Sequence, residues 1–513
     1  MKNLLIILIL TAFVLQGYAQ PADEIKFTTK PKNLGKNINS VFKDAEPKIS
    51  PDGKTLYFCR RADSRNIEGS GVGADIWFSE LTNNVWGPAK NLGRPVNDEA
   101  FNQMIGIRSD GNAIIVKGKW DEAAFTELYL HNKTPQGWGK AEPIKFDDVN
   151  WNYAESGASY CVSVDFKTMI ISFVDNGKSE SNLYVSFYLE KNIWSKPTYM
   201  GDVVNTEYGN EIYPTLGNDG TTLYYSSDGF GGYGKQDIYI TRRLDNTWAN
   251  WEKPRNLGNV VNGPGFDSDF TLDAEAKFGY ISSDVDTTVD FDIYSIELPE
   301  EARPNPVVMV TGKVLNSKTK LPIETDVVFY TLKEGTVLGR GRSNPVTGAY
   351  NLVLPYGQKY ALSAIAPNYF PISDFLDLTN VDKFRKVEKI LEIAPIENGS
   401  TVRLNNLFFE YGSANLNDES YAEIEKVIDL LKQFPAMSIE IQGHTDNIGQ
   451  DASTMKLSTD RAKTVADYIV SKGIGINRVA FKGFGKTKPK YPNNSEENRK
   501  KNRRVEFQII KVQ

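Results

Sequence analysis

The feature that most constrains this chain is a pattern that recurs about every 55 residues between residues 24 and 298. Turn sequences rich in Asp and Gly precede a short strand-like segment in each unit, and a Trp and then an Asn follow most of these segments. The strand-like segments lie at residues 75–78, 127–130, 182–185, 237–240 and 292–295. A unit of about four short strands cannot bury its own faces, so neighbouring units must pack together. The repeats therefore predict an all-β array of five sheets.

The two ends of this array complement each other. The fifth unit ends near Leu298 without the Trp-containing last strand, whereas residues 30–35 (KPKNLG) copy residues 253–258 (KPRNLG). We therefore expect the N-terminal segment to complete the last sheet and to remove an exposed edge. The array resembles the WD40-like (PD40) β-propeller repeats of bacterial periplasmic proteins. This resemblance implies a propeller of about five blades over residues 24–299 that acts as a binding platform.

Two motifs within the array favour ordinary loops. The Gly-rich run at residues 228–234 lies between two strand-like segments, so it predicts a hairpin and not a phosphate-binding loop, which needs a following helix. Four acidic residues near the end of the array have oxygens that suit calcium, but the segment lacks the Gly and the terminal Glu of an EF-hand. A solvated loop is favoured there, and calcium binding stays open for Asp284, Asp286, Asp290 and Asp292.

A second β-module follows a boundary at residues 300–306, which are rich in Pro and charge. Strand-like runs broken by Gly and Pro predict a β-sandwich over residues 307–395. These runs are residues 307–314, 327–332, 349–354 and 359–365. The stretch from Thr311 through Gly348 to Pro371 resembles the carboxypeptidase regulatory-like module, which implies a spacer or docking surface.

The C-terminal pattern alternates strands and helices and predicts an α+β domain over residues 397–513. We expect strands at residues 404–409, 438–442, 479–482 and 504–511. A first helix is indicated by the helical spacing of Tyr421, Ile424, Val427, Ile428 and Leu431. A second helix is expected to begin with Ser458 as its N-cap and to end at Gly473.

Two residues of this domain have chemistry that suits a ligand. With Ser458 as the N-cap, Arg461 falls near the start of its helix, where the helix dipole disfavours a cation by roughly 0.3 to 1 kcal/mol. An anion there would contact both the guanidinium and free backbone N–H groups. Asp446, in the loop after the strand at residues 438–442, supplies the opposite charge, so the pair suits a zwitterion. The alternative that stays open is an internal salt bridge between Asp446 and Arg461.

Three sequence blocks closely resemble the peptidoglycan-binding C-terminal domain of the outer membrane protein A family. They are GHTDNIG at residues 443–449, Leu457–Ser458 with Arg461–Ala462, and NRRVE at residues 502–506. The resemblance implies that Asp446 and Arg461 bind the side-chain end of diaminopimelate in the peptidoglycan stem peptide. It places further binding residues at Thr445, Asn447, Leu457 and Arg503. Thr454 stands where the family usually has Asn, which implies a small local change in the loop.

Composition excludes several other classes of function. A net charge of -6 does not provide the basic field that nucleic-acid binding needs. Only His131 and His444 are present, with Cys59 and Cys161, so these residues cannot assemble a zinc site of several His and Cys ligands. We expect no cofactor and no metal, two buried thiols, and a His444 that shapes its loop through hydrogen bonds.

The first residues resemble a secretory signal peptide. Lys2, an apolar run at residues 4–15, and the small residues Gly17 and Ala19 predict a signal peptide at residues 1–19 with cleavage before Gln20. The apolar run is too short for a membrane span, so the mature chain is expected to have no transmembrane segment. No Cys lies near the cleavage site, so a lipoprotein anchor is not expected.

These patterns together predict a non-enzymatic periplasmic scaffold that is bound to peptidoglycan at the inner side of the outer membrane. The propeller is expected to bind envelope or outer-membrane proteins, and the domain order resembles wall-anchored accessory subunits of type IX secretion and gliding machinery. One alternative is a cell-wall or glycan-processing enzyme that uses two propeller carboxylates. Another is a sensor whose propeller binds a small ligand, which a deep, apolar central pocket would favour. The oligomeric state stays open.

Overall fold

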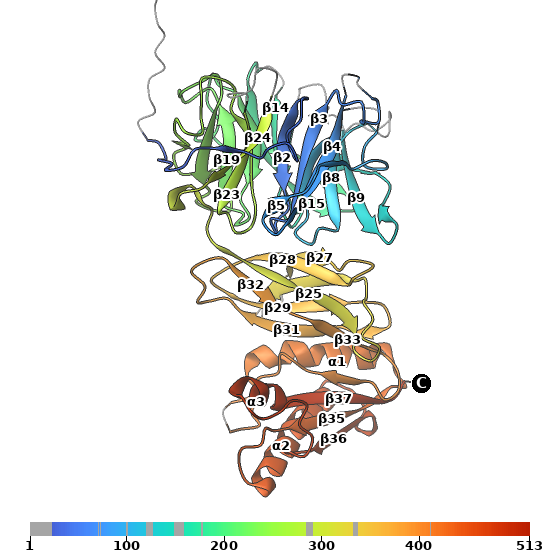
Figure 1. Cartoon of the computed structure of the whole chain (residues 1–513). Helices are drawn as coiled ribbons and strands as arrows, with labels where there is room; N and C mark the ends of the chain where they lie inside the picture. The colour runs from blue at the N-terminus through green and yellow to red at the C-terminus, as the bar shows by residue number, and fades with distance from the viewer. Residues whose placement is uncertain are drawn as a thin grey trace, which may run out of the picture.

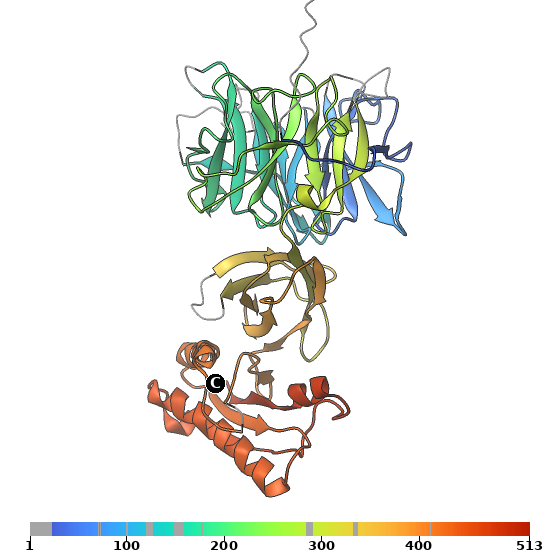
Figure 2. The same ribbon diagram turned by 90° about the vertical axis from the view of Figure 1, so that its left-hand side faces the viewer.

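The computed structural model describes residues 23–69, 71, 73–98, 101–119, 127–147, 158–175, 178–283, 291–331, 337–410 and 412–512. Three parts lie one above another: a ring of β-sheets, a two-sheet module, and an α+β domain (Figures 1 and 2). Among the described residues, no helix has the length and apolar character needed to cross a membrane. The predicted signal peptide at residues 1–19 lies outside the described residues.

The first part, here called the sheet ring (residues 23–303), has five sheets in its described residues. The first contains β2 (Asp44–Ile49), β3 (Thr55–Arg61), β4 (Ala74–Thr82), β5 (Val85–Trp86) and β6 (Lys90–Asn91). The second contains β7 (Gln103–Ile107), β8 (Ala113–Lys117), β9 (Leu128–Thr134), β10 (Gly137–Trp138) and β11 (Glu142–Pro143). The third contains β12 (Lys145–Phe146), β13 (Ser159–Val162), β14 (Thr168–Val174), β15 (Ser181–Glu190), β16 (Ile193–Trp194) and β17 (Thr198–Tyr199). The fourth contains β18 (Glu211–Leu216), β19 (Thr222–Ser227), β20 (Asp237–Arg242) and β21 (Arg255–Asn256), and the fifth contains β22 (Ser268–Leu272), β23 (Phe278–Ser283), β24 (Asp292–Glu297) and β1 (Lys32–Asn33).

The ring closes on itself. The innermost strands contact one another in the order β2, β7, β13, β18 and β22, and β22 contacts β2. The expected closure by the N-terminal segment is confirmed, because β1 pairs with β24 through Lys32 opposite Ser295 and Asn33 opposite Tyr294. Each predicted strand-like segment falls in the third long strand of its sheet. The assignment of this ring to the propeller class stays a prediction.

Asparagines that recur with the repeat hold four of the five third strands in the same way. The side-chain oxygen accepts a backbone N–H at 2.7–2.9 Å, and the side-chain nitrogen donates to the carbonyl of the same strand residue at 2.9–3.1 Å. The pairs are Asn39 with Ile293, Asn97 with Ile76, Asn205 with Leu183, and Asn262 with Ile238. The side-chain amide thus imitates a paired strand, which explains why Asn recurs with the repeat. The sequence repeat also includes Asn150, which lies outside the described residues.

Smaller predictions for the ring have mixed outcomes. Cys59 and Cys161 are buried free thiols, as expected. The Gly-rich run connects β19 to β20 and is therefore a hairpin connection, as expected. Of the four acidic residues considered for calcium, Asp284, Asp286 and Asp290 lie outside the described residues, and Asp292 accepts a hydrogen bond from Asn33 Nδ2 (2.9 Å).

The middle module (residues 307–395) consists of two sheets that enclose one apolar core. One sheet contains β25 (Val307–Asn316), β28 (Ala349–Pro355), β30 (Tyr369–Phe370), β32 (Arg385–Glu388) and β33 (Leu391–Pro395). The other contains β26 (Asp326–Thr331), β27 (Val337–Arg342), β29 (Lys359–Ile365) and β31 (Ile372–Asp377). The four predicted strands correspond to β25, β26, β28 and β29, whereas the other strands were not predicted. A short 3₁₀ turn (Glu300–Ala302) precedes the module, and Ala302 packs into the core of the ring.

The C-terminal domain has a four-stranded sheet in the order β34, β37, β35, β36. Its strands are β34 (Thr401–Arg403), β35 (Ser438–His444), β36 (Val479–Gly483) and β37 (Arg504–Lys511). Its helices are α1 (Tyr421–Gln433), α2 (Asp451–Ser471) and α3 (Glu496–Asn502). The apolar stripe of α1 is buried as predicted, and α2 ends just before Gly473, whose φ of 92° suits a residue that terminates a helix.

Two predicted elements of this domain are wrong. No strand forms at residues 404–409; the strand in this region is β34, which ends at Arg403. Leu404 N donates one more hydrogen bond to Val505 O, and Asn405 and Asn406 then form a turn. The second helix begins at Asp451 and not after Ser458. Ser458 lies inside the helix, where its hydroxyl donates to Met455 O (2.9 Å), so it does not cap the helix.

The three parts meet at two joints, and buried apolar side chains pack across both of them. Between the ring and the middle module, Asp110 Oδ2 accepts a hydrogen bond from Arg342 N (2.6 Å), and Lys167 Nζ donates to Leu338 O (2.6 Å). Between the middle module and the C-terminal domain, Phe370 of β30 joins the C-terminal core and lies 5.0 Å from the ring of Phe507. The C-terminal domain therefore shares its core with the module before it.

Candidate functional site

The loop that carries Asp446 follows β35 directly and lies against α2. A Cβ atom on Gly443 would lie 2.1 Å from Ser458 O, and one on Gly483 would lie 2.2 Å from Thr459 Oγ1. Only glycine at these strand ends allows so close an approach to the helix. Thr445 N donates to Gly485 O (2.9 Å), which ties the loop to the end of the neighbouring strand. The fold therefore holds Asp446 at a defined place beside α2.

The Asp446 carboxylate is buried, and its partner is Arg503. Arg503 Nη1 donates to Asp446 Oδ2 at 2.6 Å, and Ile448 N donates to Oδ1 at 2.9 Å. The Asp446 side chain is 8% exposed, whereas that of Arg503 is 37% exposed. Arg503 also contacts Glu496 of α3, at 2.6 Å from Nη2 to Oε1. Both carboxylates hold the pKa of Arg503 above its ordinary value, although burial opposes them.

Arg461 lies near the middle of α2 and has different partners. Its Nε donates to Ser413 O (2.9 Å), and its guanidinium lies 4.7 Å from the centre of the Phe409 ring. Burial and the nearby Arg503 lower the pKa of Arg461. Within the part of the chain that the structure describes, no carboxylate forms an ion pair with Arg461. The cation is therefore placed and oriented, but its charge is not compensated by a direct partner.

These contacts correct two predictions about the pair. Asp446 does not form the internal salt bridge with Arg461 that was left open, because Arg503 occupies the carboxylate. The expected position of Arg461 in the first helical turn is also wrong, because α2 begins at Asp451. The helix dipole and the free N–H groups of the helix start therefore do not contribute at Arg461. Arg503 links the two predicted residues, because it contacts Asp446 and lines the same pocket as Arg461.

The other predicted site residues surround Asp446 and Arg461 unequally. Thr445 is 6% exposed, and its hydroxyl donates to Asp446 O (3.0 Å), so it supports the loop. Asn447 is exposed on the same loop, and Leu457 is half-buried on α2. Thr454, the residue that departs from the family pattern, is buried, and its hydroxyl donates to Asp451 O (3.0 Å). Thr454 therefore stabilises the first turn of α2.

His444 lies below the loop and packs rather than hydrogen-bonds. Its ring stacks on Phe484 with centroids 5.2 Å apart and planes 8° apart, and neither ring nitrogen has a hydrogen-bond partner among the described residues. The expected shaping of the loop through His444 hydrogen bonds is therefore wrong. Burial and the nearby Arg504 lower the pKa of His444 to about 4. The imidazole is neutral at the pH of most cells.

The basic run at residues 499–504 is largely paired with carboxylates. Arg499 and Arg503 contact Glu496 at 2.9 and 2.6 Å, and Lys501 contacts Glu497 at 2.7 Å. Such pairing within and beside one short helix reduces the local positive field. The run therefore has the character of a solvated helix surface and not of a nucleic-acid patch.

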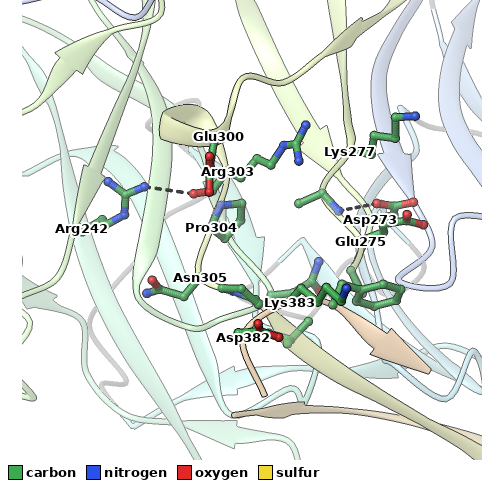
Figure 3. Close-up of a pocket in the computed structure, with 16 residues that line it drawn as sticks. Arg242, Asp273, Glu275, Lys277, Glu300, Arg303, Pro304, Asn305, Asp382 and Lys383 are labelled. Atoms are coloured by element: carbon green, nitrogen blue, oxygen red, sulfur yellow. Dashed lines mark hydrogen bonds between the residues drawn. The ribbon is translucent and has the colours of Figure 1, made fainter. Parts of the chain in front are cut away.

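A larger pocket of about 520 Å³ lies where the ring, residues 300–306 and the middle module meet (Figure 3). Arg242 Nη2 donates to Arg303 O (3.0 Å), and Asp273 Oδ1 accepts from Ala276 N (2.8 Å). Burial raises the pKa of Asp273 to about 6. Further charged side chains of both signs line the pocket, including Lys277, Glu300 and Lys383. This mixture is typical of a polar joint between two parts of a chain.

Features of the ring do not favour either predicted alternative. A glycan-processing enzyme needs two carboxylates that face an open cleft. Glu46 and Asp269 lie on the neighbouring strands β2 and β22, but each is only 8% exposed. Burial and the charge of Glu46 raise the pKa of Asp269 to about 7. The cavity lined by all five innermost strands has about 50 Å³, far below the roughly 300–1,000 Å³ of small-molecule sites, so it does not favour the sensor.

The role of several residues that shape the site was not predicted from the sequence. Phe409 and Ser413 orient Arg461, and Glu496 shares Arg503 with Asp446. Arg403 of β34 lines the same pocket as Arg461. These contacts join positions that are far apart in the chain, so no local spacing indicates them. The adjacent aromatic residues 408 and 409 led only to the prediction of a strand and not to a role in the site.

Residues 408–503 match the model of the OmpA family, so the C-terminal part of the chain contains a domain of that family. The ring and the middle module lie outside the matched residues. Outer membrane porin F of Pseudomonas aeruginosa is 38% identical over 102 residues, which are 20% of this chain and 29% of that protein. Peptidoglycan-binding protein ArfA of Mycobacterium tuberculosis is 39% identical over 101 residues, which are 20% of this chain and 31% of that protein. The chain thus spans about a third of the length of these relatives.

One solved structure is also similar in sequence to part of this chain. The cell wall anchor of the T6SS from Pseudomonas aeruginosa is 32% identical to this chain. The likeness covers 21% of this chain and 78% of that chain, with a TM-score of 0.20. The family assignment of the C-terminal domain rests on the sequence matches.

Proposed function

We propose that this protein is a non-enzymatic scaffold that binds peptidoglycan through its C-terminal domain and presents the sheet ring to protein partners. The match of residues 408–503 to the OmpA family supports the anchoring role. The name of the relative ArfA, a peptidoglycan-binding protein, supports the same ligand. An anchor of this kind acts in the periplasm, on the peptidoglycan at the inner side of the outer membrane.

The observation that carries the proposal is the uncompensated charge of Arg461 beside an acid whose partner can be exchanged. Arg461 is held by a carbonyl and an aromatic ring, and neither of these neutralises a cation. Arg503 binds both Asp446 and Glu496, so it can release Asp446 and keep Glu496. A ligand with an ammonium and a carboxylate therefore finds one acceptor and one donor in this region.

The side-chain end of diaminopimelate is a zwitterion of this kind. In the proposed complex its ammonium binds Asp446, and its carboxylate binds the guanidinium of Arg461. Thr445 fixes the loop from beneath, while Asn447, Leu457 and Arg503 contact the rest of the stem peptide. Binding needs no bond to be made or broken, so the domain requires neither a general base nor a cofactor.

The sheet ring is proposed to be a five-bladed propeller that binds envelope or outer-membrane proteins. Its closed ring of innermost strands and its repeated asparagine brackets support the propeller assignment. The middle module acts as the spacer between the partner and the wall. This order of parts also fits a subunit of a type IX secretion or gliding complex, which is the most specific part of the proposal.

Co-sedimentation of the full mature chain with isolated diaminopimelate-type peptidoglycan tests the anchor. The full chain is used because Phe370 of the middle module belongs to the C-terminal core. The test variants are Asp446→Asn and Arg461→Gln. The matched controls are Asp467→Asn and Lys463→Gln, which remove an exposed ion pair (2.6 Å) on the same helix.

The expected result is that both test variants stay folded and are lost from the pellet, whereas both controls sediment like the unchanged protein. Binding that persists in folded Asp446→Asn and Arg461→Gln would overturn the anchoring proposal. If the test variants do not fold, the assay is repeated with Arg461→Lys. That variant keeps the charge but loses the bidentate fork, and it is expected to bind more weakly than the unchanged protein.

A further inference from the structure

A groove of about 760 Å³ lies where β9 and β15 of the ring stand above β27 of the middle module (Figure 1). Its volume falls within the roughly 300–1,000 Å³ that is typical of binding sites. The groove is built by two parts of the chain and lies outside the C-terminal domain, so it is distinct from the site around Asp446.

Apolar side chains of both parts line this groove. Ile115, Ile144 and Trp194 are buried residues of the ring that border it. Tyr188 of β15 and Val337 of β27 also line it, and they are 42% and 47% exposed. The ring of Tyr188 packs edge-on against that of Trp194, with centroids 5.8 Å apart. A bound apolar group would remove this surface from water, which the hydrophobic effect favours.

Two cations lie beside the apolar surface. Lys167 Nζ donates to Leu338 O (2.6 Å), and no carboxylate of the described residues forms an ion pair with it. Arg340 is 63% exposed, and its guanidinium is 4.0 Å from Asp326 Oδ2. Burial lowers the pKa of Lys167; the charge of Asp165 opposes this shift, and that of Arg340 adds to it. Lys167 and Arg340 are therefore close enough to repel each other, and a carboxylate between them would relieve this repulsion.

The acids that line the groove leave these cations available. Asp165 accepts a hydrogen bond from Lys167 N (3.1 Å) within its own turn. Glu190, at the exposed end of β15, forms no ion pair in the part of the chain that the structure describes. Arg108 is a third cation of the groove; its Nε contacts Asp110 at 2.7 Å, and its buried Nη2 has no acceptor among the described residues. The groove thus combines an apolar surface with donors for an anion.

We propose that this groove binds an extended segment of a partner protein in which a large apolar residue stands next to an acidic one. The apolar side chain covers Tyr188 and Val337, and the carboxylate binds Lys167 and Arg340. Exposed apolar surface with a polar border is typical of protein-binding sites, whereas a small-molecule site encloses most of its ligand. The inference rests on the proposed partner-binding role of the ring, and it adds the surface and the chemistry of the partner.

Fluorescence anisotropy with labelled peptides tests this proposal on the full mature chain. The probes are ten-residue peptides of Gly and Ser that carry Phe, Trp, Leu or Ile beside Asp at the centre, in either order. Each has a counterpart with Asn in place of Asp. The unchanged protein is expected to bind at least one Asp probe, about three-fold or more tightly than its Asn counterpart, as for a partly exposed ion pair.

Variants separate the charged and the apolar contributions. Lys167→Gln and Arg340→Gln are each expected to reduce the preference for Asp. Val337→Ser is expected to weaken the binding of both members of a probe pair by about three-fold or more and to leave their ratio unchanged. The matched controls are Lys253→Gln, at an exposed lysine of the ring, and Val346→Ser, at a valine of the middle module that is 58% exposed. Both controls should bind like the unchanged protein.

Absence of binding to every Asp probe, or equal affinity for the Asp and Asn counterparts, would overturn the proposal. Binding of laurate that Val337→Ser weakens, with no peptide bound, would identify a small-molecule site and would also overturn it. Capture of solubilised envelope proteins by the unchanged chain and by Val337→Ser separates this failure from that of the proposed function. Equal capture by both would overturn the role of the groove and keep the ring as a platform, whereas no capture by either would overturn partner binding itself.

Discussion

Arg503 Nη1 lies 2.6 Å from Asp446 Oδ2, and this ion pair joins the loop after β35 to the residue between α3 and β37. The acid is 8% exposed and the arginine 37% exposed, so water reaches one side of the pair only. The pair holds the loop in place. Its loss should therefore be measurable as stability and not only as binding.

Arg503→Gln is expected to lower the free energy of unfolding of the C-terminal domain by about 1 kcal/mol, because it leaves the buried Asp446 carboxylate without its charged partner. Asp446→Asn combined with Arg503→Gln should cost less than the sum of the single changes. Urea unfolding of the four proteins forms a double-mutant cycle that measures this coupling. Strictly additive effects would contradict a direct interaction.

The two histidines provide a test of burial by NMR, because the chain contains only His131 and His444. The imidazole of His444 is expected to titrate with a pKa of about 4, because burial and Arg504 oppose its charged form. Burial also lowers the pKa of His131. Two signals that titrate near the ordinary value of 6.5 in the folded chain would contradict the packing described for both rings.

The same His444 shift has a consequence for stability. A histidine whose folded pKa is depressed binds fewer protons than the unfolded chain, so stability falls as the pH drops from about 6.5 toward 4. The loss should reach about 3 kcal/mol below that range. Urea unfolding of the unchanged protein and of His444→Gln at pH 7 and pH 4.5 measures it, and the variant should show the smaller change with pH.

Asp269 makes the opposite prediction for the ring. Its folded pKa of about 7 lies above the ordinary value of 3.8, so the group favours folding at low pH, and this contribution is lost as the pH rises toward and through 7. Asp269→Asn removes the buried charge and is expected to raise the melting temperature of the ring more at pH 8 than at pH 5, because the loss begins near pH 3.8 and is complete only above pH 7. Glu80→Gln, at a residue whose side chain is 63% exposed, is the control. An equal gain at both pH values would show that the charge is not the cause.

Closure of the ring depends on Asn39, which hydrogen-bonds both the N–H and the carbonyl of Ile293 at 2.9 Å. Asn39→Ala leaves two buried backbone groups without partners and should cost roughly 2 to 4 kcal/mol. Hydrogen exchange followed by mass spectrometry should show faster exchange in β1 and β24 than in β19 and β20. Uniform acceleration over all five sheets would indicate instead that the ring unfolds as one unit.

The repeats and the apolar stripes predicted the larger elements because both follow from local periodicity. The third strand of every ring sheet, the closing copy of residues 253–258 and the buried face of α1 all come from spacing within the chain. The start of α2 was misplaced because Ser458 has the residue type of a cap but bonds back within the helix. The partner of Asp446 was missed because Arg503 is 57 positions away, and only tertiary packing selects it over Arg461.

The shared core around Phe370 has a mechanical consequence. Bending the C-terminal domain away from the middle module would expose the contact of Phe370 with Phe507 to water, which the hydrophobic effect opposes. The joint at Asp110 combines hydrogen bonds with an apolar cluster in which Ala274 of the ring packs against Val307 and Met309 of the middle module. A sideways pull on the ring is therefore opposed by apolar packing at both joints and is transmitted along the whole molecule to the C-terminal domain.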